Sequence, residues 1–129
     1  MLMTLVPLAF ERLRESAQYR DAVRAVLTDV RQARSRAQSE GREIRFAVNL
    51  ARRTYGLEGR PPRVLPEPLQ LRATVANIDI APDRAMSIRF LPGGGATGGS
   101  IDILRPGGGG TRLTVDWLSG AVSQAQLQQ

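Results

Sequence analysis

Hydrophobic side chains recur every three or four residues along the first third of the chain. Between Phe10 and Glu40 there is no proline or glycine, and the apolar positions lie on one helical face: Leu13, Ala17, Val23, Val26, Leu27, Val30, Ala33 and Ala37. This period is typical of an amphipathic helix, and Gly41 supplies a natural stop. The pattern predicts one rod of roughly 45 Å whose stripe, from Leu13 to Ala37, is buried against the rest of the chain.

After Gly41 the hydrophobic period changes to two. Alternation over Ile44–Leu50 predicts a half-buried strand, and the polar turn 51–54 returns the chain as a second strand through Tyr55 and Leu57. Later strands are expected at 69–75, 86–90, 101–103 and 113–117. Residues 59–68 hold four of the eight prolines, which excludes a central strand there. The sequence therefore predicts an antiparallel β-domain after the helix.

Two turns near the end of the chain predict the strand register. If Arg105 faces Thr111 across the turn 106–110, then Ile103 faces Leu113 and Ile101 faces Val115, with the large apolar side chains on one side. A two-residue turn at Ser119 and Gly120 would set Trp117 against Val122. The polar residues that follow, from Ser123 to Gln129, are expected to fray.

These elements predict an α+β fold in which one long N-terminal helix packs on a sandwich-like antiparallel β-domain of two sheets. A length of 129 residues suits one such unit. We divide the chain into the helix at 1–41, whose residues 1–10 are a hydrophobic remnant, the β-domain at 42–123 and a polar tail at 124–129. Residues 1–10 are too few to cross a bilayer, which needs about 20.

Composition removes most catalytic designs. The sequence contains neither histidine nor cysteine, so it cannot build a Ser-His-Asp triad, a Cys-His dyad or a zinc finger. The net charge is +6, and all 18 basic residues are arginines. They are spread along the chain, which favours a solvated surface over a site for one acidic partner.

Three clusters remain as candidate chemistry. Asp79 and Asp83 flank Pro82, and Asp102 and Asp116 lie on neighbouring predicted strands, but loop and outward-facing strand positions explain both pairs better than acid–base catalysis. The spacing G-x-G-x-x-G at 93–98 leads into a strand, not into the helix that a dinucleotide site requires, so a tight β-connection is favoured. The arginines at 31–36 and 42–53 could contact nucleic-acid phosphates. Only Tyr55 lies nearby for base stacking, so a solvated basic face is favoured.

The order of these parts resembles the type IV pilin superfamily and, within it, the minor pseudopilin H family (GspH) of type II secretion systems. The resemblance covers nearly the whole chain and rests on four stretches in the family's order: the helix end Gln32–Arg42, Ile88–Gly93, Thr97–Ile101 and Val115–Val122. The sequence lacks the family's prepilin cleavage motif and most of its hydrophobic half-helix. We therefore expect a shortened soluble form with Met1 added.

Membership of that family implies a mechanical role without catalytic residues, metal or cofactor. The missing helix half would anchor the subunit in the bacterial inner membrane, with the globular domain in the periplasm. The implied place is the tip of the pseudopilus, supporting export of folded proteins across the outer membrane. The implied partners are other minor pseudopilins and the major pseudopilin, with the secreted substrate or outer-membrane channel as further candidates.

The hydrophobic end of the helix is the candidate assembly surface. The apolar side chains from Leu2 to Phe10 have no expected partner within the chain. The candidate assembly residues are Leu2, Leu5, Val6, Leu8, Phe10 and Leu13. Such an exposed apolar end is costly for a monomer and useful for assembly. The alternative is a type IV pilus minor pilin that captures DNA, but residues 121–129 carry no charged side chain, so DNA is not expected as a partner. An enzyme that uses the paired aspartates comes third.

Overall fold

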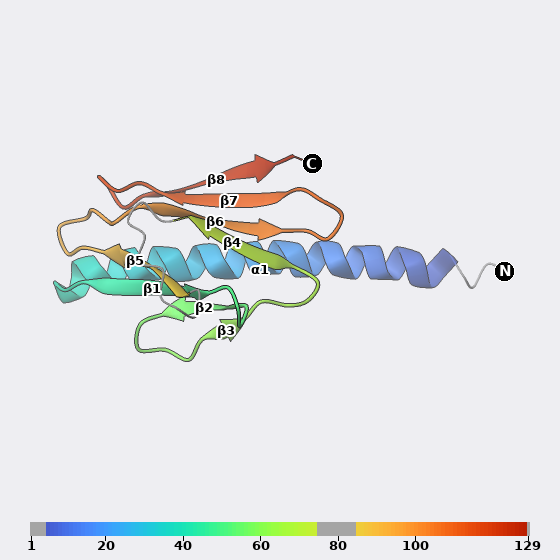
Figure 1. The fold of residues 1–129 in the computed structure, drawn as a ribbon, viewed down its shortest axis with the longest axis horizontal. Helices are drawn as coiled ribbons and strands as arrows, with labels where there is room; N and C mark the ends of the chain where they lie inside the picture. Colours follow the sequence, from blue (N-terminus) through green and yellow to red (C-terminus); the bar gives the residue numbers. More distant parts are fainter. Residues whose placement is uncertain (1–4, 75–84, 129) are drawn as a thin grey trace.

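One long helix carries two antiparallel sheets along its C-terminal two thirds (Figure 1). The computed structural model describes the backbone of residues 5–74 and 85–128 and the side chains of residues 13–74 and 86–128. Helix α1 spans Leu5–Glu40, with Pro7 in its first turn. Gly41 has a φ of 66°, which a residue without a side chain adopts at low cost, and it ends the helix as predicted.

The strands of the described residues form two sheets of four, all paired antiparallel. The first has the order β3-β2-β1-β5, with β1 at Ile44–Asn49, β2 at Thr54–Leu57, β3 at Arg63–Val64 and β5 at Ala85–Phe90. The second has the order β4-β6-β7-β8, with β4 at Gln70–Thr74, β6 at Gly99–Leu104, β7 at Gly110–Val115 and β8 at Val122–Leu127. The predicted α+β class and first hairpin are confirmed.

The core lies between the helix and the inner faces of both sheets. On α1 the buried stripe runs through Tyr19, Ala22, Val23, Val26, Val30, Ala33 and Ala37. It meets alternate strand residues, including Ile44, Phe46, Ile88, Phe90, Ile101, Ile103 and Leu113. The rings of Phe46 and Tyr55 lie 6.3 Å apart at a tilt of 35°, which joins β1 to β2. The helical and strand periods thus bury one continuous apolar surface.

The buried stripe begins later than the sequence predicts. Leu13 is 69% exposed, and among the helix side chains from residue 13 onwards, where they are described, the first buried one is Tyr19. The reason is geometric, because the N-terminal part of α1 extends beyond the ends of the strands (Figure 1). The expectation that Leu13 packs on the sheet is therefore wrong.

The hairpin between β6 and β7 is tighter than predicted. Ile103 lies opposite Thr111 and Ile101 opposite Leu113, so the partners shift by two residues and the inward face is preserved. The Arg105 amide donates to the Gly109 carbonyl at 3.0 Å, and Gly108 and Gly109 have φ angles of 97° and 77°. Arg105 is thus bonded to Gly109 and not, as predicted, set against Thr111. The turn can close there because two consecutive glycines adopt left-handed φ angles at low cost.

The last hairpin also differs from its prediction. Val122 lies opposite Val115, so the connection comprises residues 116–121 and Trp117 does not face Val122. The polar segment that follows does not fray from its start, because residues 122–127 form strand β8 on β7. The fraying predicted for residues 123–129 is thus wrong over residues 123–127. Main-chain pairing to β7 holds this segment in a strand. Its sequence lacks the alternation of apolar and polar residues that would have predicted a strand.

Candidate functional site

The N-terminal part of α1 extends beyond the ends of the strands (Figure 1). Of the six predicted assembly residues, Leu2 lies outside the described residues. Four lie on the described backbone of the helix, without described side chains: Leu5, Val6, Leu8 and Phe10. The sixth, Leu13, is exposed. The structure thus puts five of the six on one helical segment.

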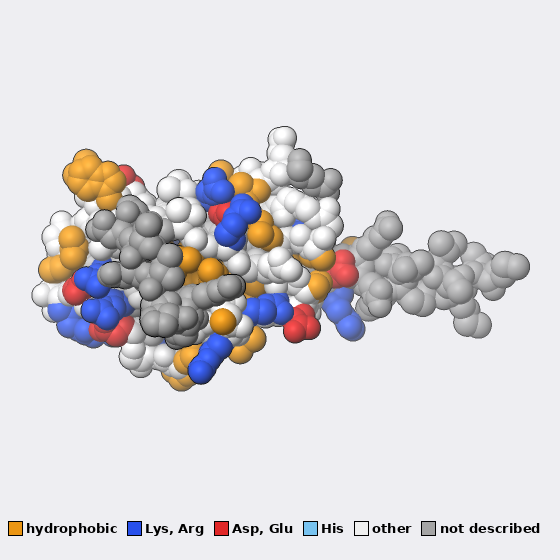
Figure 2. Space-filling model, viewed as in Figure 1, with side chains coloured by type: hydrophobic (Ala, Val, Ile, Leu, Met, Phe, Trp, Pro, Cys, Tyr) orange, Lys and Arg blue, Asp and Glu red, His pale blue; other side chains and the backbone are white. Residues whose placement is uncertain are grey.

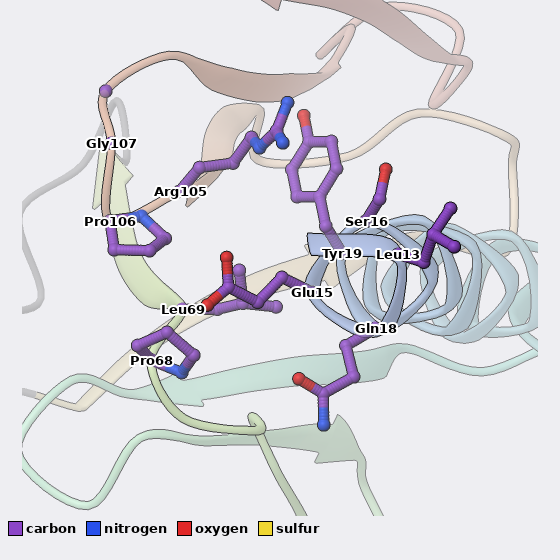
Figure 3. A pocket seen from close by; sticks show the side chains of 11 residues that line it. Leu13, Glu15, Ser16, Gln18, Tyr19, Pro68, Leu69, Arg105, Pro106 and Gly107 are labelled. Carbon is purple, nitrogen blue, oxygen red and sulfur yellow. The ribbon is translucent and has the colours of Figure 1, made fainter. Parts of the chain in front are cut away.

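A groove lies where this helical segment meets the β-domain. Its volume is about 500 Å³, and its walls come from α1, from the start of β4 and from the β6–β7 turn: Leu13, Glu15, Ser16, Gln18, Tyr19, Pro68, Leu69, Arg105, Pro106, Gly107 and Gly108. Figure 3 shows the Arg105 side chain reaching towards the Tyr19 ring, with Leu13 further along the helix. The groove therefore combines aliphatic walls with one cation and one carboxylate.

Tyr19 holds the inner end of the groove in place. The Arg105 guanidinium lies 5.0 Å from the centre of the Tyr19 ring, a cation–π geometry. The Tyr19 hydroxyl hydrogen-bonds the buried Thr111 hydroxyl on β7. These contacts tie the helix to the second sheet next to the exposed segment. Tyr19 is not among the residues predicted from the hydrophobic pattern, although it lies three and four residues before Ala22 and Val23 on the same stripe.

Asp29 is a second buried polar residue that the sequence analysis missed. It is 3% exposed on α1, and its carboxylate lies 3.4 Å from Nε of Arg63 on β3. Burial, followed by the nearby Asp29 charge, raises the pKa of Tyr55. A lone aspartate within an apolar period carries no sequence signal for its distant partner. Asp29 therefore acts as a tie between the helix and the first sheet.

The predicted carboxylate pairs have structural roles where they are described. Asp102 is 2% exposed on β6 and bonds to Arg72 on β4 and Arg112 on β7, with contacts of 2.7–3.1 Å. Burial opposes ionisation, but the hydrogen bonds from Arg112 and Arg72 outweigh it and lower the pKa of Asp102. Asp102 points outward as predicted, yet the two arginines cover it. The other pair, Asp79 and Asp83, lies outside the described residues.

Asp116 shapes a loop and does not share a site with Asp102. Its carboxylate accepts hydrogen bonds from the Ser119 amide at 3.1 Å and the Ser119 hydroxyl at 2.7 Å, and these bonds lower its pKa. The loop it caps packs on the glycine-rich segment 93–98, where the Ala96 amide donates to the Trp117 carbonyl at 2.9 Å. A Cβ on Gly120 would lie 2.4 Å from the Gly94 carbonyl oxygen. The glycines thus allow loop packing, and the segment leads into β6, as predicted.

Charges are spread over the face seen in Figure 2, where arginines stand among acidic and uncharged side chains. Large exposed apolar side chains occur on α1 (Leu13), on β3 (Val64) and in loops, where Trp117 and Leu118 are 66% and 69% exposed. Within the described residues, no three acidic side chains come together as metal ligands would. Among the same residues, no helix has the length and hydropathy of a membrane span.

Comparisons with known proteins agree with one another. The family model described as "Type II transport protein GspH" matches residues 22–120. A solved structure, the minor pseudopilin EpsH from the type 2 secretion system of Vibrio cholerae, superimposes with a TM-score of 0.65 at 14% identity, covering 84% of this chain and 96% of that one. No curated protein sequence matches the chain. The predicted pilin-like fold is confirmed, and the matched family is the one that the sequence motifs indicate.

Proposed function

We propose, because the chain belongs to the GspH family of type II transport proteins, that this minor pseudopilin works at the tip of the type II secretion pseudopilus. There it supports the export of folded proteins across the outer membrane. Its partners are the other minor pseudopilins and the major pseudopilin. A segment before the described helix anchors it in the inner membrane, and the β-domain lies in the periplasm.

The exposure of Leu13 near the start of α1 is the observation that carries the proposal. Leu13 is 69% exposed, and the sequence before it is rich in leucine, valine and phenylalanine. A monomer gains nothing from presenting Leu13 to water, whereas a neighbouring helix that covers it buries apolar area at roughly 25 cal/mol per Å². We infer that this segment packs among the helices of the filament.

The groove beside Leu13 offers a partner protein specific side-chain contacts next to this segment. A partner side chain of aliphatic character fits against the exposed residues Pro68 and Pro106, while Glu15 and Arg105 offer one charge of each sign. The role is structural and not catalytic. Asp102 and Asp116 support this view, because each is occupied in holding a strand or a loop.

Deletion of the gene tests the role in export. In a strain without this subunit, type II substrates should accumulate in the periplasm and fall in the culture medium, and the intact gene should restore their release. Unchanged release without the subunit would refute the proposed role.

A substitution in the full-length protein tests the surface. Leu13→Glu should fold with an unchanged melting temperature, because the side chain is exposed, yet fail to restore export. Val64→Glu is the matched control, since Val64 is also 69% exposed but lies on the edge strand β3. Restoration by Leu13→Glu as complete as that by Val64→Glu would show that the helix end is not the assembly surface.

A further inference from the structure

Among the described residues, no strand pairs with the outer edge of β8, and this edge lacks the features that normally protect one. Strand β8 is the outermost strand of the second sheet, and its six residues pair one to one with β7, without a bulge. The segment Val122–Leu127 contains no charged residue, proline or glycine. By contrast, the edge strand β3 has only two residues and follows Pro61 and Pro62. Edges of natural sheets usually carry charges, prolines or bulges, because an open edge accepts another strand.

The outward main-chain groups of β8 can be assigned from the ladder. The Asp116 amide donates to the Ala121 carbonyl at 2.9 Å, so residue 121 points towards β7. Direction alternates along an antiparallel strand, which leaves the amides and carbonyls of Val122, Gln124 and Gln126 pointing to the free edge. The side chains of these three residues face the helix, because each lines a hollow shared with α1.

A stripe of arginines on α1 follows this edge. It comprises positions spaced by four and three residues, hence on one helical face: Arg20, Arg24, Leu27, Arg31 and Arg34. Arg20, Arg24 and Leu27 line a hollow of about 220 Å³ with Gln124 and Gln126. Arg31 and Arg34 line one of about 470 Å³ with Ala121 and Val122. We call this surface, which residues of α1 and β8 line together, the arginine groove.

The arginines of the groove lack acidic partners among the described side chains. None of the four takes part in the ion pairs found there. Of the two acids between Arg20 and Arg34, Asp29 pairs with Arg63 on the opposite flank and Asp21 is exposed off the stripe. In addition, Nε of Arg34 is buried without a hydrogen-bond partner. The groove therefore presents positive charge that nothing described on this chain neutralises.

We propose that the arginine groove binds an extended acidic segment of a partner protein, which adds to β8 as a further strand. Main-chain hydrogen bonds form with Gln124 and Gln126, and carboxylates on alternate residues of the segment reach the arginines. The spacings agree: alternate strand residues lie about 6.7 Å apart, and Arg20 and Arg24 are about 6 Å apart along the helix axis. The whole stripe, about 21 Å long, matches about six strand residues.

Nucleic acid fits this groove less well. Single-stranded binding sites use aromatic side chains as stacking platforms. Among the described residues that line the groove, the one aromatic residue is Tyr19. Its hydroxyl is hydrogen-bonded to Thr111, and the Arg105 guanidinium lies over its ring. The proposal concerns a different surface from the helix end, and it stands independently of where the subunit sits in the filament.

A designed peptide tests the proposal on the full chain. The probe is an eight-residue, end-capped peptide that alternates glutamate with valine, and the control peptide carries lysine in place of glutamate. The glutamate peptide should slow amide hydrogen exchange at Gln124 and Gln126 and bind more weakly as salt rises. The proposal is overturned if the glutamate peptide leaves exchange unchanged or if the lysine peptide protects β8 equally.

Paired variants separate the two parts of the site. Gln124→Pro removes an outward N–H without touching the β7 ladder, and proline is tolerated at such edge positions. It should weaken binding by about fivefold or more, whereas Gln124→Ala should bind within about twofold of the wild type. Equal binding by the proline and alanine variants would show that no strand is added.

Charge reversal tests the arginines in the same way. The double variant Arg24→Glu and Arg31→Glu should weaken the glutamate peptide by about tenfold or more at low salt. Arg52→Glu, at an exposed site in the β1–β2 turn, should not weaken it.

A short duplex DNA is the competing ligand. If DNA binds, is lost in the double variant and is insensitive to Gln124→Pro, while the peptide fails to bind, the groove is a phosphate site and the proposal is wrong.

Discussion

Replacement of Asp102 by asparagine should destabilise the second sheet without changing its shape. The Asp102 carboxylate lies directly opposite Arg72 on β4 and Arg112 on β7. Four contacts of 2.7–3.1 Å join it to the two guanidinium groups. Asparagine keeps the volume and one acceptor oxygen but removes the charge that holds both arginines.

The size of the effect follows from the burial of the three side chains. Removal of one partner from a fully buried ion pair costs about 3–5 kcal/mol. Here the carboxylate is 3% exposed, but Arg72 and Arg112 are 56% and 42% exposed, so both remain partly solvated. We therefore expect a loss of about 2–3 kcal/mol in the free energy of unfolding. That loss corresponds to a fall of roughly 6–12 °C in melting temperature.

Urea denaturation at pH 7 measures the difference, with Glu43→Gln as the control. The Glu43–Arg89 contact is longer, at 3.8 Å, and both side chains are about 40% exposed, so its loss should cost under about 0.5 kcal/mol. The folded state lowers the pKa of Asp102 below its ordinary 3.8, so its contribution is present above that pH and is lost as the pH falls through the folded value. A loss for Asp102→Asn no larger than for Glu43→Gln, or one that grows in acid, would refute this reasoning.

Two further substitutions test the helix contact and the loop packing. Tyr19→Phe removes the hydroxyl that bonds to buried Thr111 and should cost about 1–2 kcal/mol in urea denaturation, whereas no loss would mean that water satisfies Thr111. Gly120→Ala, at a φ of 72° and facing the Gly94 carbonyl at 2.4 Å, should cost about 2 kcal/mol or more, while Gly107→Ala, with open space around it, should stay within about 0.5 kcal/mol. Equal stability of the two glycine variants would contradict the proposed loop packing.

The helix and the strand alternation could be predicted from the sequence because both depend on local periods. Ile44, Phe46 and Val48 are all buried on β1, and Val26, Val30 and Ala33 are all fully buried on α1. These patterns state which face of each element is apolar. Each element can bury that face only against the others, so the α+β class follows.

Features that depend on distant contacts were harder to predict. The register at Ile103 was wrong by two residues, because the turn closes through left-handed glycines that the sequence allows but does not require. Strand β8 was missed because its polar residues carry no alternation, and Leu13 was assigned to the core because periodicity does not show where a sheet ends. Burial of Asp102 depends on two arginines, of which Arg72 lies 30 residues away in the chain.

The candidate assembly surface could be proposed from sequence, but its immediate surroundings could not. The apolar run before Leu13 is visible in the sequence, and the structure shows that Leu13 is exposed. The groove formed with Pro68, Leu69 and Arg105 brings together segments far apart in the chain. The arginine groove likewise requires β8, which the sequence did not predict.

Site-specific crosslinking in cells tests the central claim most directly, because the described sequence contains no cysteine of its own. Leu13→Cys is introduced into the full-length protein, with Arg52→Cys as the control at an exposed turn on the β-domain. A short bifunctional thiol reagent, used with single cysteines in the helices of the other pseudopilins, should join Leu13→Cys to at least one of them and leave Arg52→Cys uncoupled. Absence of every crosslink from Leu13→Cys in cells that secrete normally would contradict the account.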